Sequence, residues 1–285
     1  MKTSEVFGHY IHISAKRRWY ELKLAEVWKY RDLILLLTRR NFVLTFKQTI
    51  LGPIWIFLNP FITSVIFSVV FGGIAGINTD GIPQILFYLC SNALWGFFAE
   101  CVNKNASTFV ANAQVFGKVY FPRLVVPISN VLSSLIRLGI QMILLVMFLI
   151  YYICLGQVHP NWGMWFLIPL SLIQLAVLGM GVGILISSLT TKYRDLSILV
   201  GFGVSLWMYA TPIVYPLSQT QNPLLQKLLL INPVTTPVEV IRYVLLGKGT
   251  IILGYAFLSW LITFLLAVLG LMLFNYVEKT FMDTV

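Results

Sequence analysis

Between residues 39 and 60 the chain reads Arg-Arg-Asn-Phe-Val-Leu-Thr-Phe-Lys-Gln-Thr-Ile-Leu-Gly-Pro-Ile-Trp-Ile-Phe-Leu-Asn-Pro. The sequence before this stretch is charged and mixed, whereas the sequence after it is mostly apolar. Basic and apolar residues alternate in its first half, which is typical of a helix lying in a membrane interface. Gly52-Pro53 should end that helix, because proline lacks the amide proton and restricts the residue before it. We therefore predict an amphipathic helix over Asp32–Leu51 that turns into the first membrane span.

The composition is that of a membrane protein. Of the 285 residues, 58% are hydrophobic and 11% are charged, whereas about a quarter of the residues of a soluble domain are charged. Several separate apolar runs reach the roughly 20 residues that cross a bilayer core. The expected fold class is all-α, a polytopic membrane protein with six transmembrane helices.

Short polar turns separate the predicted spans. These spans are Pro53–Gly72, Gln84–Val102, a third that starts around Leu124–Pro127 and has its uninterrupted core at Leu138–Leu155, Met164–Leu189, a fifth ending near Val214, and Ile251–Tyr276. The predicted domains are a cytoplasmic N-terminal segment over 1–52, a transmembrane domain over 53–276 and a cytoplasmic tail over 277–285.

Two amphipathic pieces precede the last span, at Leu224–Ile231 and Val238–Leu246. Neither is long enough to cross a bilayer, and prolines flank both of them. Such pieces are tolerated at membrane depth only where protein or water satisfies their turns. We predict two re-entrant helices at the outer surface.

The distribution of basic residues predicts the orientation. Sixteen of the 20 Lys and Arg residues fall on one predicted side and three on the other, with Arg137 on the shoulder of the third span. Because basic loops mark the cytoplasmic side, both termini should be cytoplasmic. The net charge of +10 then predicts contact with membrane lipid rather than nucleic acid. Glu100, near the cytoplasmic end of the second span, should face protein or water.

Motifs for catalysis are absent from the sequence. It has no Gly-x-x-x-x-Gly-Lys-Ser/Thr phosphate loop, so the chain should not hydrolyse ATP and should hold no cofactor. It has no Gly-x-Ser-x-Gly or His-Glu-x-x-His motif, and neither a Cys nor a carboxylate cluster joins His9 and His12 into a metal site. A transporter subunit is expected rather than an enzyme.

Aromatic residues make up 14% of the chain. Because sugar rings stack on aromatic faces, some of these side chains are candidates for lining a substrate channel. The candidates are Tyr88, Trp95 and Phe98 on the second span and Trp207, Tyr209 and Tyr215 on or just after the fifth. Aromatic residues also gather at membrane interfaces and pack helices, and this alternative remains open.

Three segments resemble one known family. They are Thr45-Phe-Lys-Gln-Thr-Ile-Leu-Gly-Pro-Ile-Trp55, Lys118-Val-Tyr-Phe-Pro-Arg123, and Tyr193-Arg-Asp-Leu196 followed by Tyr209-Ala-Thr-Pro-Ile-Val-Tyr-Pro216. The chain resembles the membrane subunit of ABC-type polysaccharide exporters, which include O-antigen, capsule and teichoic acid permeases. The resemblance implies a homodimer in a bacterial inner membrane, bound to two copies of a cytoplasmic ABC ATPase that binds Mg-ATP. It also implies a channel for a glycan linked to polyprenyl pyrophosphate.

Roles follow for two sets of residues. Arg39, Arg40 and Lys47 are predicted to attract the lipid pyrophosphate, with anchoring to lipid headgroups as an equal alternative. Residues of two cytoplasmic connectors are predicted to contact the ATPase. These are Asn112, Gln114, Phe116, Lys118, Tyr193, Arg194 and Asp195.

Three other functions stay open. The chain could be an ABC permease for another cargo, such as teichoic acid, capsule, a drug or a lipid. It could be a self-contained channel, which would need no ATPase. A membrane enzyme acting on lipid-linked sugar is the third alternative, and the missing acid and base residues disfavour it.

Overall fold

The computed structural model describes residues 24–47, 52, 54–119, 121–190, 195–220 and 222–284. This part of the chain is helical and contains no strand, which confirms the predicted all-α fold. The helices are α1 Leu24–Lys29, α2 Arg31–Phe46, α3 Ile54–Phe67, α4 Gln84–Ala106, α5 Thr108–Phe116, α6 Val125–Cys154, α7 Leu167–Thr190, α8 Leu196–Tyr209, α9 Pro223–Ile231, α10 Thr235–Leu246 and α11 Leu253–Thr284. The π-helical stretch η1, Ser68–Ile74, continues α3, and two short 3₁₀ turns occupy Trp162–Met164 and Leu217–Gln219.

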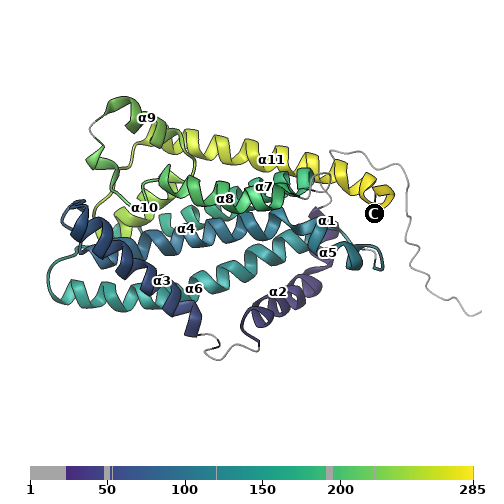
Figure 1. Cartoon of the computed structure of the whole chain (residues 1–285), viewed down its shortest axis with the longest axis horizontal. Coiled ribbons are helices and arrows are strands. Elements are labelled where there is room, and N and C mark those ends of the chain that lie inside the picture. The colour runs from purple at the N-terminus through teal and green to yellow at the C-terminus, as the bar shows by residue number, and fades with distance from the viewer. Residues whose placement is uncertain are drawn as a thin grey trace, which may run out of the picture.

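Helix α4 is the centre of the bundle. Most of its residues are buried, whereas fewer than a third of the residues in the apolar segments of α3, α6 and α11 are buried. Packed neighbours follow one another in the order α11, α7, α4, α6 and α2. Helices α9 and α10 lie at one end of the bundle, and α1, α5 and the C-terminal end of α11 lie at the other (Figure 1). Any site on α4 is therefore enclosed from several sides.

Glycines let α7 approach the helices on both of its flanks. A Cβ atom at Gly183 would lie 2.5 Å from the Asn105 Cβ and 2.9 Å from the Val102 carbonyl oxygen of α4. A Cβ atom at Gly181 would lie 2.8 Å from the Ala267 Cα of α11. Close contact of small residues is a common way to pack helices in lipid, where apolar side chains gain little from association.

Five described helical segments are long and apolar enough to span a membrane: Ile54–Ile74, Gln84–Ala106, Val125–Cys154, Leu167–Thr190 and Leu253–Glu278. They correspond to the first, second, third, fourth and sixth predicted spans. The third is one continuous helix from Val125 on, in agreement with its predicted start around Leu124–Pro127. Pro127 interrupts nothing, because it lies in the first turn, where its missing amide proton has no helical partner.

The predicted fifth span is shorter than expected. Helix α8 ends at Tyr209 rather than near Val214, and Pro212 follows within the next three residues. Its 14 residues correspond to about 21 Å at 1.5 Å per residue. This is less than the hydrocarbon thickness of a bilayer, about 30 Å.

The amphipathic helix also ends early. The predicted helix over Asp32–Leu51 is interrupted, because α2 ends at Phe46 and Lys47 adopts an extended backbone. The predicted end at Leu51 and Pro53 lie outside the described residues. The buried side chains of α2 are Ile34, Leu37 and Thr38, all in its first half. Short helices depend on tertiary packing for their stability. Among the described side chains of the second half, Asn41 and Phe42 are partly buried and the others are exposed.

Two short helices precede the last span, as predicted, and their place at the outer surface stays a prediction. Helices α9 and α10 meet at an angle of 95° and precede the last span, as expected for a bent or re-entrant pair. The predicted tail differs in one respect. Helix α11 continues without a break to Thr284, so most of residues 277–285 extend the last helix.

Candidate functional site

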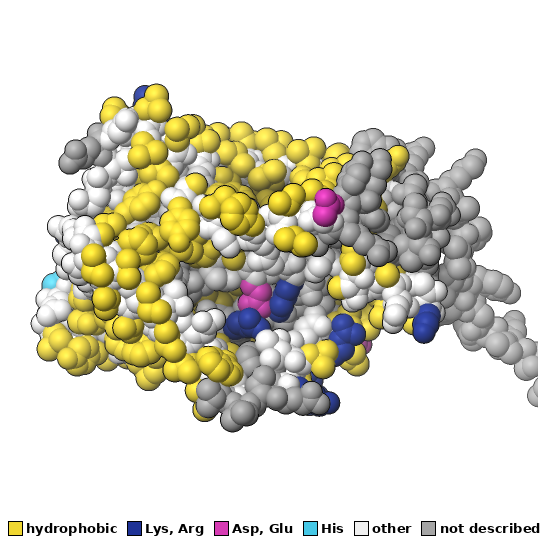
Figure 2. Space-filling view, in the orientation of Figure 1, with side chains coloured by type: hydrophobic (Ala, Val, Ile, Leu, Met, Phe, Trp, Pro, Cys, Tyr) yellow, Lys and Arg dark blue, Asp and Glu magenta, His cyan; other side chains and the backbone are white. Residues whose placement is uncertain are grey.

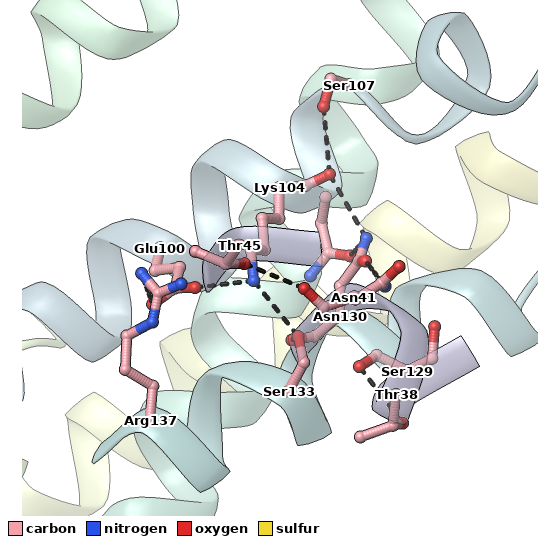
Figure 3. Close-up of polar contacts among 11 residues, drawn as sticks. Thr38, Asn41, Thr45, Glu100, Lys104, Ser107, Ser129, Asn130, Ser133 and Arg137 are labelled. Atoms are coloured by element: carbon pink, nitrogen blue, oxygen red, sulfur yellow. Dashed lines mark hydrogen bonds and ion pairs between the residues drawn. The ribbon is translucent and has the colours of Figure 1, made fainter. Parts of the chain in front are cut away.

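A cluster of three charged residues lies where α4 meets α6 (Figure 3). Glu100 Oε1 is 2.7 Å from the Lys104 ammonium, and Glu100 Oε2 is 3.3 Å from Arg137 Nη1. The side chains of Glu100, Lys104 and Arg137 are 14%, 27% and 24% exposed. The prediction that Glu100 faces protein rather than lipid is confirmed. We call these three residues the charged triad.

Helix geometry explains how the charged triad forms. Glu100 and Lys104 are four residues apart on α4, a spacing that places two side chains on the same helical face. Arg137 comes from the fourth turn of α6, which packs alongside α4. Glu100 lies six residues before the end of α4, or about 9 Å inside that end of the helix. The triad is therefore below the helix ends and not at the tip of a loop.

Uncharged polar side chains connect the charged triad to α2. Lys104 Nζ donates to Ser133 Oγ at 3.2 Å, and Asn130 Nδ2 donates to Asn105 Oδ1 at 3.1 Å. Asn41 of α2 donates from Nδ2 to Asn130 Oδ1 at 3.0 Å. This polar network joins α2, α4 and α6. Its side chains hydrogen-bond to one another, because the apolar side chains around them offer no donors or acceptors. It fixes where α2 lies on the bundle (Figure 3).

A small cavity opens beside Arg137. It has a volume of about 290 Å³ and is lined by Thr45 of α2, by Trp55, Ile56 and Asn59 of α3, and by Arg137 and Gln141 of α6. Figure 2 shows basic and acidic side chains together in a hollow, with hydrophobic side chains covering much of the surface to the left of it. The volume is close to the lower limit of small-molecule pockets. The cavity thus offers room for a compact polar group next to a guanidinium.

The predicted basic residues of α2 lie outside this cavity. Arg39, Arg40 and Lys47 are all exposed, while the opposite face of the helix packs against α6. Arg40 Nη2 donates to Asn41 Oδ1 at 3.3 Å, so one of the three touches the polar network. Their exposure suits attraction of a headgroup from the surrounding solution, and they do not form an enclosed site.

Three of the six candidate channel aromatics are packed inside the subunit. Tyr88, Trp95 and Phe98 are buried in the main hydrophobic cluster around α4. Phe98 packs on both Trp95 and Trp207, with ring centroids 5.3 Å and 5.2 Å apart. Half-buried Trp207 also donates from Nε1 to Asn232 Oδ1 at 3.2 Å. In this conformation these four side chains stabilise the packing of α4 against its neighbours.

The two remaining candidates lie near the end of α8. Tyr209 is 56% exposed, and the half-buried Tyr215 donates its hydroxyl to the Tyr209 carbonyl at 3.1 Å. Burial raises the pKa of the Tyr215 hydroxyl above its ordinary value, so this group stays protonated and able to donate. Tyr209 is the candidate that a single subunit presents most openly.

The predicted ATPase contacts are divided between surface and core. Gln114 and Lys118 are exposed and Asn112 is partly exposed, whereas Phe116 is buried against Phe109 and Phe121. Asp195 is exposed at the start of α8. Tyr193 and Arg194 lie outside the described residues. Helix α5 thus exposes Gln114 together with Val110 and Val115, and its two phenylalanines pack inward.

Sequence reasoning missed the role of Arg242, which it counted only among the three basic residues on the outer side. Arg242 is buried and pairs with Glu239, its Nη1 lying 2.8 Å from Oε1. It also donates to the Pro212 carbonyl, and its guanidinium lies 4.4 Å from the Phe87 ring centroid. Glu239 Oε2 accepts from the Thr250 amide at 2.9 Å. The three-residue spacing of the pair on an amphipathic helix was the available signal.

The sequence was compared with known proteins. The profile of the ABC-2 type transporter family matches residues 32–246. A protein of Klebsiella pneumoniae named O-antigen export system permease protein RfbA is 28% identical over 253 residues, covering 88% of this chain and 94% of the relative. A second protein with that name from the same organism is 26% identical over 255 residues, with the same coverage. A Myxococcus xanthus protein of the same name is 27% identical over 215 residues, covering 74% of this chain and 79% of the relative.

Proposed function

The chain belongs to the ABC-2 type transporter family, and from this premise we propose that it is the membrane subunit of an ABC exporter for O-antigen. The observation that carries the proposal is the likeness to permeases of that name along nearly their whole length. A bundle with five long apolar helices and a bent outer pair agrees with it. The cargo would be a glycan linked to polyprenyl pyrophosphate, crossing a bacterial inner membrane.

In this proposal the energy comes from a separate ABC ATPase. The described connector best suited to receive it is α5, whose exposed Gln114 and adjacent Lys118 stand at the end of the bundle that also carries α1. Asp195, at the start of α8, belongs to the second of the two connectors that are predicted to contact the ATPase. Both termini are proposed to be cytoplasmic, which puts α5 on the side where ATP is available.

The passage itself is proposed to form between two copies of the chain. A single bundle whose centre is filled by α4 has no room for a hydrated polymer. A pair related by two-fold symmetry can open a passage between its halves. Tyr209 and Tyr215 are the aromatic candidates best placed to meet sugar rings there. Tyr88, Trp95, Phe98 and Trp207 would need a rearrangement of α4 and α8 to do so.

Arg39, Arg40 and Lys47 are proposed to gather the anionic lipid carrier at the cytoplasmic surface. Their exposure supports this role, because surface cations raise the local concentration of anions. The same exposure supports anchoring to bilayer headgroups. Exchanging all three for glutamine separates the two roles, since loss of anchoring would lower the amount of inserted protein.

The test is export in a bacterium that makes O-antigen but lacks its own exporter. We expect surface O-antigen when the chain is expressed with its ABC ATPase, and none when the phosphate-loop lysine of that ATPase is replaced. Antibody labelling of intact cells measures the polymer at the surface. Surface O-antigen without any ATPase would instead identify a self-contained channel. Absence of surface polymer despite correct insertion and active ATPase would point to another cargo.

A further inference from the structure

We propose that an open cavity between η1, the loop 75–83 and the end of α6 binds a neutral sugar unit. The cavity has a volume of about 540 Å³, and small-molecule sites usually measure about 300–1,000 Å³. The apolar part of its wall consists of Ile77, Ile82 and Pro83. An apolar wall with a few well-placed polar groups is the usual composition of such a site.

The polar groups of the cavity are uncharged. Amide side chains come from Asn78, Gln84 and Gln157, and a hydroxyl group comes from Thr79. An amide group both donates and accepts hydrogen bonds, as a sugar hydroxyl does, so the two can pair in either direction. None of the described lining residues carries a charge. The wall therefore suits a neutral ligand with several hydroxyl groups better than a phosphate or a metal ion.

The amide side chains are available to a ligand. Asn78 and Gln157 are exposed, and neither side chain has a hydrogen-bond partner among the described residues. Gln84 Oε1 accepts from Ser68 Oγ at 3.2 Å, which holds this side chain across η1. The N–H groups of the Gln84 amide have no partner in the described part of the chain. A ligand could thus bind all three amides without breaking a contact within the fold.

The wall is held in place although most of it belongs to a loop. The Ile82 amide donates to the Thr79 carbonyl at 3.0 Å, and the two residues between them have φ values of 56° and 80°. This combination defines a type I′ turn. The Ile77 amide donates to the Phe71 carbonyl of η1 at 2.8 Å, which fixes the start of the loop. A wall that is ordered in advance loses less conformational freedom when a ligand binds.

The loop is also tied to the segment before α9. Both carboxylate oxygens of Asp80 accept from Ser218 Oγ at 2.7 Å, and one of them accepts from Gln219 Nε2 at 3.4 Å. Ser218 and Gln219 form the turn that precedes α9. The cavity therefore lies at the end of the bundle that carries α9 and α10, where an exported polymer would emerge. That the sugar belongs to the cargo rests on the proposed function.

The experiment is saturation-transfer difference NMR on the purified chain in nanodiscs, which detects weak binding of small ligands. The probes are galactose, mannose, rhamnose and N-acetylglucosamine, each as the free sugar and as its methyl glycoside. A methyl glycoside has no free reducing end and so resembles a unit inside a polymer. Inorganic phosphate is the charged competitor.

The variants remove amides from inside and outside the cavity. The double variant Asn78→Ala, Gln157→Ala should keep the fold, because both side chains are exposed and make no contact that the fold needs. Gln226→Ala on α9 is the matched control, since it removes the same amide at the same end of the bundle but outside the cavity. If the double variant does not fold, the two single variants decide, one from each side of the cavity.

We expect at least one sugar to bind, both free and as its methyl glycoside. The double variant should weaken that binding by about tenfold, the scale of two lost hydrogen bonds between neutral groups. Gln226→Ala should bind like the unmodified chain, and phosphate should not compete. Competition by phosphate would contradict the neutral character of the site.

The two forms of each sugar identify the source of the ligand. Binding of the methyl glycosides supports a unit of the exported glycan. Binding of free sugars alone would overturn that assignment, because a polymer unit has no free reducing end. If no probe binds, or if the double variant and Gln226→Ala bind alike, the cavity is only a hydrated hollow and the proposal is wrong. The assay needs neither ATPase nor polymer, so its failure would leave the export proposal to its own test.

Discussion

At the scale of single residues, Arg242 shows how a charge is kept within the apolar end of the bundle. Its guanidinium is paired with Glu239, donates to a backbone carbonyl and lies over the Phe87 ring. These contacts fasten α10 to α4 and to the turn after α8. A buried charge is tolerated only while such partners are present. Removing one partner leaves the other with an uncompensated desolvation free energy.

Arg242→Ala should therefore destabilise the protein by about 3–5 kcal/mol, because it leaves the Glu239 carboxylate buried without its cation. The double variant Glu239→Gln, Arg242→Met removes both charges and should lose markedly less. Chemical unfolding of the detergent-solubilised protein, followed by tryptophan fluorescence, measures both. Equal losses in the single and double variants would contradict this account of the pair.

The limits of sequence reasoning are visible at this scale. The position of Glu100 within an apolar run predicts that its side chain avoids lipid. The sequence also offers Lys104, four residues later on the same helical face, as its ion-pair partner. The contact of Arg137 with Glu100 could not be predicted, because the sequence does not indicate which face of α6 packs against α4. The cavity beside it depends on α2, α3 and α6 converging. Such a site could not be predicted without the packing of the helices.

At the scale of elements, the apolar runs predicted where the long helices lie, and packing decided where the others end. The spans at α3, α4 and α7 were found from length and hydropathy alone. The end of α2 at Phe46 was not predicted, because the alternation of basic and apolar residues continues past it in the sequence. The sequence contains the glycines of α7, but only the structure shows which of them pack against α4 and which against α11.

Gly183→Ala should destabilise the contact between α7 and α4. The added Cβ would meet the Val102 carbonyl at 2.9 Å, and that backbone atom cannot move without the whole of α4. The expected loss is about 1–3 kcal/mol, the usual effect of overpacking. The control is Gly201→Ala on α8, where nothing lies within 4 Å of the added atom. Because alanine favours helix more than glycine, the control should be neutral or stabilising in thermal unfolding. Similar midpoints for both variants would refute the packing argument.

At the scale of the whole molecule, α5 is joined to α7 and α11, which are neighbours at one end of the order of packed helices. Phe109 of α5 stacks on Phe274 of α11 with centroids 4.5 Å apart, and the Phe109 amide donates to Ser187 Oγ of α7 at 3.4 Å. Arg123, which precedes α6, donates to the Glu278 carbonyl of α11 at 2.6 Å. A displacement of α5 would thus act on α7 and α11 together, as coupled movement of packed elements requires.

If a partner ATPase acts on α5, cysteine crosslinking should detect it there. We expect Gln114→Cys to crosslink to cysteines placed on the surface of the ATPase, because Gln114 is exposed and is one of the proposed contact residues. Ser218→Cys, exposed in the turn before α9, is the control and should give no product. Gel mobility of the purified complex reports both. Crosslinks from Ser218→Cys alone would place the ATPase at the opposite end and reverse the proposed orientation.

The brevity of α8 has a consequence for the lipid around the protein. An apolar helix of about 21 Å cannot match hydrocarbon about 30 Å deep, so acyl chains alongside it must compress, or something else must replace them. A second protein surface or a column of water would relieve that mismatch. We therefore expect a hydrophobic mismatch along the flank of α8, which includes the exposed side chains of Phe202 and Tyr209. The resistance of the bilayer to a passing polar group is lowest where the bilayer is thinnest.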